Sequence, residues 1–144
     1  MKPIGYWLNR TDQALTRSMD SLLAEHGLTR SAWQVLNVVR EAQDALDGGP
    51  PTRDHDVLTV LAANADAATL TAAVEALLAD GWATRPEPGR LALTDDGRAR
   101  LAGVAERVHA FRDLATAGIP PEEYRTAVSV LERMTRNLES PPAT

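Results

Sequence analysis

Apolar residues recur at spacings of three and four along six stretches of the chain, the spacing that lines one face of an α-helix. Glycine follows three of these stretches, at Gly27, Gly81 and Gly118, as is typical of positions just beyond a helix end. The pattern therefore predicts six helices, which span residues 4–26, 29–45, 54–63, 66–80, 94–117 and 120–139.

The helical spacing is interrupted after the fourth predicted helix. Two short β-type runs, Trp82–Arg85 and Leu91–Thr94, follow there and are joined by the turn Pro86–Gly89. Residues 57–98 thus have the order helix, turn, helix, hairpin, which is the order of a winged helix-turn-helix, a module that places its second helix in a DNA major groove. The break Gly48–Pro51 predicts an exposed linker before this module.

Length and composition indicate one mostly helical domain. The chain has 144 residues, of which 44% are hydrophobic but only 4% aromatic. It contains no cysteine, which excludes disulfides and thiolate metal sites. Its apolar runs are shorter than the ~20 residues of a membrane span, and its start lacks a signal-peptide pattern. We therefore expect a cytoplasmic protein without a membrane partner.

Charge counts against DNA binding unless the basic residues are gathered on one surface. The formal net charge is -5, and the fourth helix contains neither lysine nor arginine. Between Arg53 and Arg100 there are five arginines and eight acidic residues, so the winged segment is itself acidic. Such a balance suppresses non-specific attraction to phosphates.

Several short segments, in this order and spacing, resemble the MarR family of winged-helix transcriptional regulators over nearly the whole chain. They are Ile4–Leu8, Gly27–Thr29, Trp33–Leu36, Leu77–Gly81 and Leu93–Arg98. The last, with the pattern Leu-Thr-x-x-Gly-Arg, is the most typical of the family.

The resemblance implies a mostly α fold with a small β-hairpin wing and with dimerisation helices at both ends. Residues 1–144 would form a single MarR-like domain, in which residues 4–26 and 99–140 pair two copies and residues 29–98 form the winged lobe. Long apolar stripes on the first and last helices agree with a symmetric homodimer, because a helix-turn-helix core cannot cover them. Family members bind pseudo-palindromic operators in double-stranded DNA, usually as repressors, and many release DNA when a small aromatic or phenolic effector binds.

The expected DNA contacts lie on the fourth helix and the wing. Thr69 and Thr71 occupy the family's hydroxyl positions, whereas Ala72 stands where the family usually has an arginine. Arg90, oriented by Glu87, and Arg85 are expected to enter the minor groove, which attracts arginine. Arg53 completes the DNA-binding set. The alternative is that the threonines are ordinary exposed residues and that the wing arginines are only solvated.

Five residues are candidates for an effector pocket, because aromatic rings stack on an aromatic ligand and a guanidinium pairs with its carboxylate. They are Tyr6, Trp7, Arg10, Trp33 and His109. The alternative for the two tryptophans is packing in the core or at the interface.

No catalytic or metal-binding pattern is present, so we expect neither an enzyme nor a cofactor. The three histidines, His26, His55 and His109, lack metal-ligand spacing, and no Ser/His/Asp order or phosphate-binding glycine loop is found. The sequence thus favours a ligand-responsive, homodimeric repressor. The alternative is a dimeric small-molecule or protein-binding module of the same fold with weak or lost DNA binding, and an enzyme is a distant third hypothesis.

Overall fold

Six helices and three short strands make up the regular structure within residues 1–45 and 50–141, the part of the chain that the computed structural model describes. In chain order they are α1 (Ile4–Glu25), α2 (Arg30–Ala45), β1 (Thr52–Arg53), α3 (Asp54–Leu61), α4 (Ala67–Ala79), β2 (Ala83–Thr84), β3 (Arg90–Leu93), α5 (Asp95–Ala115) and α6 (Pro121–Glu139). The chain divides into two compact units, Met1–Val108 and His109–Thr144. The predicted glycine linker falls partly on residues 46–49, which lie outside the described residues.

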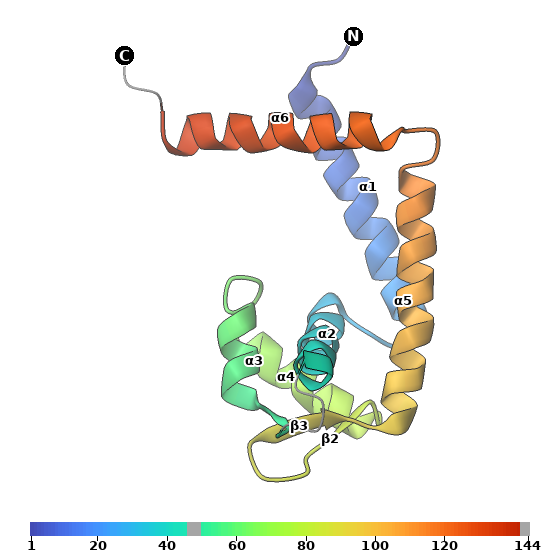
Figure 1. Cartoon of the computed structure of the whole chain (residues 1–144), viewed down its shortest axis with the longest axis vertical. Coiled ribbons are helices and arrows are strands. Elements are labelled where there is room, and N and C mark those ends of the chain that lie inside the picture. Colours follow the sequence, from blue (N-terminus) through green and yellow to red (C-terminus); the bar gives the residue numbers. More distant parts are fainter. Residues whose placement is uncertain (46–49, 142–144) are drawn as a thin grey trace. The chain divides into compact units, whose positions relative to one another are not determined.

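The first unit is built around α2, which contacts α1, α3, α4, β1 and β3 (Figure 1). Its core is formed by side chains that are at most 1% exposed, and they come from every part of the unit. These are Leu23, Val35, Leu36, Val39, Val57, Leu70, Trp82, Leu91, Leu101 and Val104. The apolar faces of α2, α3 and α4 therefore meet the end of α1 and the first part of α5 in one hydrophobic core, which fixes the helix-turn-helix and the wing against each other.

Side-chain caps fix the starts of two helices at the predicted residues. The Thr29 hydroxyl accepts a hydrogen bond from the Ala32 N–H at 3.1 Å, and Asp66 accepts one from the Thr69 N–H at 2.8 Å. Such caps satisfy backbone donors that have no partner inside the helix. Two predicted helix ends are two residues too late, because α3 ends at Leu61 rather than at residue 63 and α5 ends at Ala115 rather than at residue 117.

The wing is a three-stranded antiparallel sheet in the order β1-β3-β2. The predicted hairpin is present as β2 and β3, with Ala83 opposite Leu93. The third strand was not predicted: in β1, Thr52 lies opposite Leu91 and Arg53 opposite Arg90. Two residues are too few to show the alternation that identifies a strand, so this strand has no signal in the sequence.

Thr94 joins the wing to α5. Its hydroxyl accepts a hydrogen bond from the Gly97 N–H at 2.8 Å and donates one to the Gly81 carbonyl at 2.7 Å. A Cβ on Gly97 would lie 1.9 Å from the Trp82 carbonyl oxygen, so only glycine fits there. Residues of the Leu-Thr-x-x-Gly pattern thus connect the end of α4, the wing and the start of α5 through hydrogen bonds and close packing.

The second unit contains the end of α5 and the whole of α6. Pro121 opens α6, and Glu122 and Glu123 follow in its first turn, where the helix dipole favours carboxylates. None of the residues of α6, all of which are described, is buried. Among the described residues, no helix is both long enough and apolar enough to cross a membrane.

Candidate nucleic-acid interface

Helix α4 has one buried and one exposed face. Leu70, Ala73, Val74 and Leu77 are buried, whereas Thr69, Thr71 and Ala72 are exposed. Hydrogen bonds from Thr69, first its amide and then its hydroxyl, lower the pKa of the capping Asp66 below its ordinary value of 3.8. The exposed face of this helix therefore carries small hydroxyl and methyl groups, which can contact phosphates, base edges and thymine methyls.

Arg90 lies at the base of the wing and not at its tip. Its guanidinium donates a hydrogen bond to the Pro51 carbonyl at 2.8 Å, and the side chain is only partly exposed. The expectation that Glu87 orients this arginine is not met among the described residues, where Glu87 contributes its backbone carbonyl to the Arg90 N–H at 3.1 Å. The pairing of β1 with β3 explains the difference, because it brings the Pro51 carbonyl to Arg90.

Arg85 is held by the first residue of α3. Its Nη1 lies 2.9 Å from Oδ1 of Asp54, and both side chains are about one-third exposed, at 32% and 33%. The same nitrogen donates a longer hydrogen bond, of 3.4 Å, to the Arg90 carbonyl. The bond to Asp54 raises the pKa of Arg85, and nearby Glu75 adds a smaller favourable charge, so the guanidinium stays charged.

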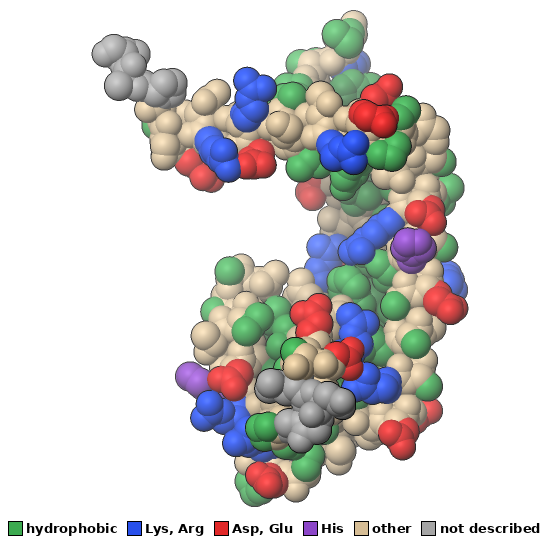
Figure 2. All heavy atoms as spheres, in the orientation of Figure 1, with side chains coloured by type: hydrophobic (Ala, Val, Ile, Leu, Met, Phe, Trp, Pro, Cys, Tyr) green, Lys and Arg blue, Asp and Glu red, His purple; other side chains and the backbone are tan. Residues whose placement is uncertain are grey.

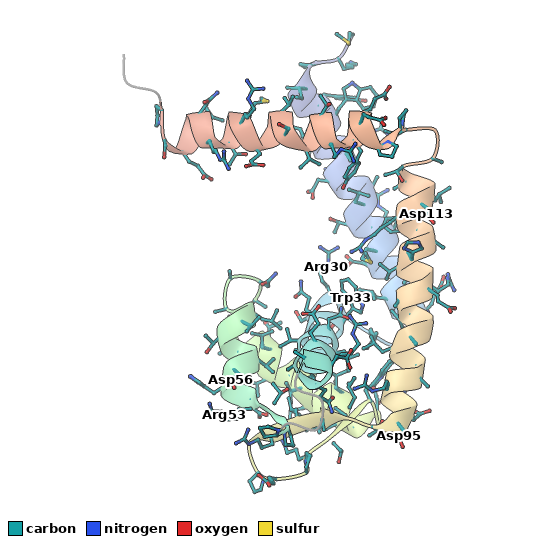
Figure 3. The ribbon with its side chains drawn as sticks, viewed as in Figure 1. Arg30, Trp33, Arg53, Asp56, Asp95 and Asp113 are labelled. Carbon is teal, nitrogen blue, oxygen red and sulfur yellow. The ribbon has the colours of Figure 1, made fainter. Side chains whose placement is uncertain are left out.

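One arginine of β1 and two near the start of α5 are also paired with carboxylates. Arg53 contacts Asp56 at 3.4 Å, where β1 meets α3 (Figure 3), and Arg98 contacts Asp44 at 2.9 Å. Arg100 lies 3.6 Å from Asp96, and its guanidinium stacks on the ring of Trp82, 3.8 Å from the centroid. On the face that Figure 2 shows, acidic and basic side chains alternate over this lobe and do not form a broad basic patch.

A shallow hollow of about 450 Å³ lies beside the wing base, lined by apolar residues of α2, the Pro50–Pro51 segment and α3. Arg53 and Arg90, which face each other across β1 and β3, both border it together with Asp56. The structure thus brings two of the predicted DNA-binding arginines together at one place.

The predicted effector residues are only partly brought together. On α1, the rings of Tyr6 and Trp7 meet edge to face with centroids 5.0 Å apart, and Arg10 donates a hydrogen bond to the Tyr6 hydroxyl at 3.1 Å. Trp33 is half-buried on α2 (Figure 3). His109 belongs to the second unit, where its Nε2 lies 3.6 Å from the Asp113 carboxylate on the exposed surface of α5.

Two residues that position the wing were missed by the sequence analysis. Asp54 binds Arg85 across 31 residues of sequence, and the side-chain oxygen of Gln43 on α2 accepts a hydrogen bond from the Leu93 N–H at 3.1 Å. Neither residue lies in a recognisable motif. Their roles depend on segments that the fold brings together, so no local signal could have identified them.

Comparison with solved structures identifies the fold. MarR of E. coli in its reduced form matches with a TM-score of 0.68 and 21% identity, covering 93% of this chain and 94% of the other. A MarR family protein of Mycobacterium tuberculosis in complex with DNA matches with a TM-score of 0.67 and 22% identity, covering 93% of this chain and 98% of the other. CouR of Rhodococcus jostii bound to p-coumaroyl-CoA matches with a TM-score of 0.66 and 20% identity, covering 99% of this chain and 96% of the other.

These three proteins are similar to this chain along nearly their full length. No protein-family model matches the chain. No curated protein sequence matches it either. The observed order of elements and the shared winged lobe confirm the resemblance that the sequence motifs indicated. The chain therefore has the fold of the MarR family of winged helix-turn-helix transcriptional regulators.

Proposed function

We propose that this protein is a homodimeric, ligand-responsive transcriptional repressor that binds a pseudo-palindromic operator in duplex DNA. Residues 29–98 act as the DNA-binding lobe, and the helices over residues 4–26 and 99–140 join two copies. The observation that carries the proposal is the lobe itself: α4 exposes Thr69 and Thr71 beside a capped N-terminus, and the arginine-bearing wing belongs to the same unit. Helix N-termini bind phosphates through free backbone donors and the helix dipole.

The apolar faces of the terminal helices support a dimer. On α1, Ile4, Trp7, Leu8 and Leu15 are each more than 40% exposed although they share one helical face. On α6, Tyr124, Val128 and Leu138 are 53%, 47% and 81% exposed. Large exposed apolar stripes mark interaction surfaces, and a second copy of the chain is the partner that symmetry favours. Two lobes joined in this way present two recognition helices to half-sites in successive major grooves.

An aromatic or phenolic effector is the proposed ligand. The Tyr6, Trp7 and Arg10 cluster on α1 offers two rings and a guanidinium, which suit a ring that carries an anionic group. The structural similarity to CouR, which was solved with p-coumaroyl-CoA, agrees with a ligand of this kind. The effector acts by a population shift: it binds one arrangement of the lobes more tightly than the other. The proposed activity is non-enzymatic.

A binding experiment on the protein's own upstream DNA tests the function. A regulator should bind one upstream duplex with nanomolar to sub-micromolar affinity and prefer it to a scrambled duplex of equal length. Its affinity should fall steeply as the salt concentration rises. Fluorescence anisotropy over a salt series measures this, with sedimentation for the oligomeric state. Arg90→Ala should weaken operator binding several-fold, whereas Arg17→Ala on α1, outside the lobe, should not. Equal affinity for upstream and scrambled duplexes at low salt would overturn the proposal.

A second candidate function is a dimeric small-molecule or protein-binding module that has kept the fold without the DNA contacts. The observation that favours it is the pairing of the lobe's arginines with its own carboxylates, together with a recognition helix whose one charged residue is Glu75. This candidate predicts a dimer that binds an aromatic anion with no measurable affinity for any upstream duplex. The same anisotropy series, repeated with salicylate as a probe ligand, separates the two.

A further inference from the structure

The contact between Asp54 and Arg85 differs from the other ion pairs of the winged lobe. It joins α3 to the wing, and its two side chains are the least exposed of the lobe's paired groups. Asp54 also donates its backbone N–H to the Gly89 carbonyl at 3.0 Å, on the other side of the wing turn. One residue of α3 thus holds both sides of the turn that carries the wing's arginines.

A carboxylate competes with a phosphate for the same guanidinium. Both present anionic oxygens to a planar donor, and a charge-assisted hydrogen bond at 2.9 Å is a strong one. Arg85 must leave Asp54 to bind a phosphate, or else keep it and approach DNA as a nearly neutral pair. Non-specific duplex offers mainly phosphates, so it gains little from an arginine that is already occupied.

We propose that Asp54 is a specificity-determining positioning residue: it withholds Arg85 from the phosphate backbone, lowers non-specific DNA affinity and fixes where Arg85 is presented. This inference rests on the proposed DNA-binding function. It also explains one acidic residue of the lobe, because the Asp54 carboxylate would position the Arg85 guanidinium. A purely structural role for Asp54 would instead make its loss weaken binding to every duplex.

Asp54→Asn tests this, with Asp56→Asn as a matched control. Both substitutions remove one negative charge from the first turn of α3 and leave one arginine without its carboxylate. The Arg53–Asp56 contact is longer and its arginine is already 61% exposed, so freeing Arg53 should change DNA affinity less than freeing Arg85. Anisotropy is measured on the upstream duplex and on a scrambled duplex of the same length, over a salt series. Asp54→Asn should raise affinity for the scrambled duplex several-fold more than Asp56→Asn does. It should also steepen the dependence of log K on log[salt] by about 0.9, the value for one added phosphate contact.

Two further variants guard the interpretation. In an Arg85→Ala background Asp54→Asn should lose its extra effect, because no guanidinium remains to be released. Asp54→Glu keeps the charge and should restore a salt slope close to that of the native protein. Should Asp54→Asn unfold the lobe, as judged by circular dichroism, Asp54→Ser is also neutral and suits a helix start.

The outcomes separate the inference from the function on which it rests. If the native protein prefers no upstream duplex to the scrambled one, the proposed function fails and the inference falls with it. If that preference is present but the Asn variants at positions 54 and 56 behave alike, the effect comes from the lost negative charge or from freeing any arginine, and the inference about Asp54 alone is overturned. If Asp54→Asn instead lowers the affinity for both duplexes, Asp54 has a purely structural role and the inference is overturned.

Discussion

Gly97 shows how one missing side chain determines a junction of this fold. It lies in the first turn of α5, where its backbone N–H is bound by Thr94 and its Cα faces the Trp82 carbonyl. Glycine usually weakens a helix interior, because it loses more backbone entropy on folding than other residues do. Here the close approach of Trp82 outweighs that cost, since any other residue would push the wing away from α5.

Gly97→Ala should therefore destabilise the protein, by about 2 kcal/mol, as expected for overpacking against a backbone that cannot move freely. Gly103→Ala is the matched control, because Gly103 lies on the same helix and a methyl group there would have no neighbour within 4 Å. That variant should be more stable than the native protein by about 0.5–1 kcal/mol. Urea unfolding at one protein concentration measures both, and a stabilising effect of Gly97→Ala like that of Gly103→Ala would contradict the close contact.

Helices are the elements that the sequence predicted best, and the wing is the one it predicted least well. The predicted starts at Thr29 and Asp66 coincide with side-chain caps in the structure, because a short polar side chain before an apolar stripe is a local signal. Strand β1 has only Thr52 and Arg53, so it depends on its partner strand for recognition. The same holds for the candidate site. Helical spacing predicts that Thr69 is exposed, whereas the Asp54–Arg85 contact joins residues far apart in the sequence and is visible only in the structure.

The cap of α4 makes part of the stability dependent on pH. Because the folded pKa of Asp66 is lowered, its contribution is complete above the ordinary value of 3.8 and is lost as the pH falls through the lower folded value. Asp66→Ala should therefore lower the melting temperature at pH 7, and the gap to the native protein should narrow once the pH falls below 3.8. Asp66→Asn, which keeps an acceptor but no charge, should show a smaller melting temperature gap that narrows over the same pH range, because the titration belongs to the native carboxylate. Thermal unfolding followed by circular dichroism from pH 7 to pH 3.5 measures this, and a gap that widens in acid would refute it.

The exposed face of α4 can be tested as a DNA-contacting element by adding a charge to it. Ala72→Arg places a guanidinium on that face and should tighten binding to a scrambled duplex several-fold at low salt, with a steeper salt dependence. Ala102→Arg adds the same charge to an exposed position of α5 and should change the affinity less. Equal effects of the two variants in anisotropy would mean that α4 does not lie against DNA.

At the scale of the whole molecule, the proposed homodimer would cover the apolar faces of the terminal helices. Helix α6 has an apolar face and no buried residue, so association through that face would add hydrophobic stabilisation. If two copies pair in this way, mass action should make the stability of the protein rise with its concentration.

Val128→Asp should disrupt the dimer, because it places a charge in the middle of the apolar face of α6. Ser129→Asp, one residue along and also exposed, is the matched control and should leave the dimer intact. Sedimentation equilibrium at micromolar concentration distinguishes single subunits from pairs. The monomeric variant should also lose operator affinity at least tenfold, since each half-site would be bound alone. A Val128→Asp variant that remains paired would exclude this face as the interface.

The three tryptophans lie in three different surroundings, so their fluorescence can report on different parts of the protein. Trp82 is 1% exposed and covered by the guanidinium of Arg100, so its emission should resist quenching by iodide until the lobe unfolds. Trp7 is 51% exposed on the face of α1 that a second copy would cover. Dilution should therefore make Trp7 accessible to iodide while Trp82 stays shielded, and the difference between native and Trp7→Phe spectra would report subunit dissociation separately from unfolding.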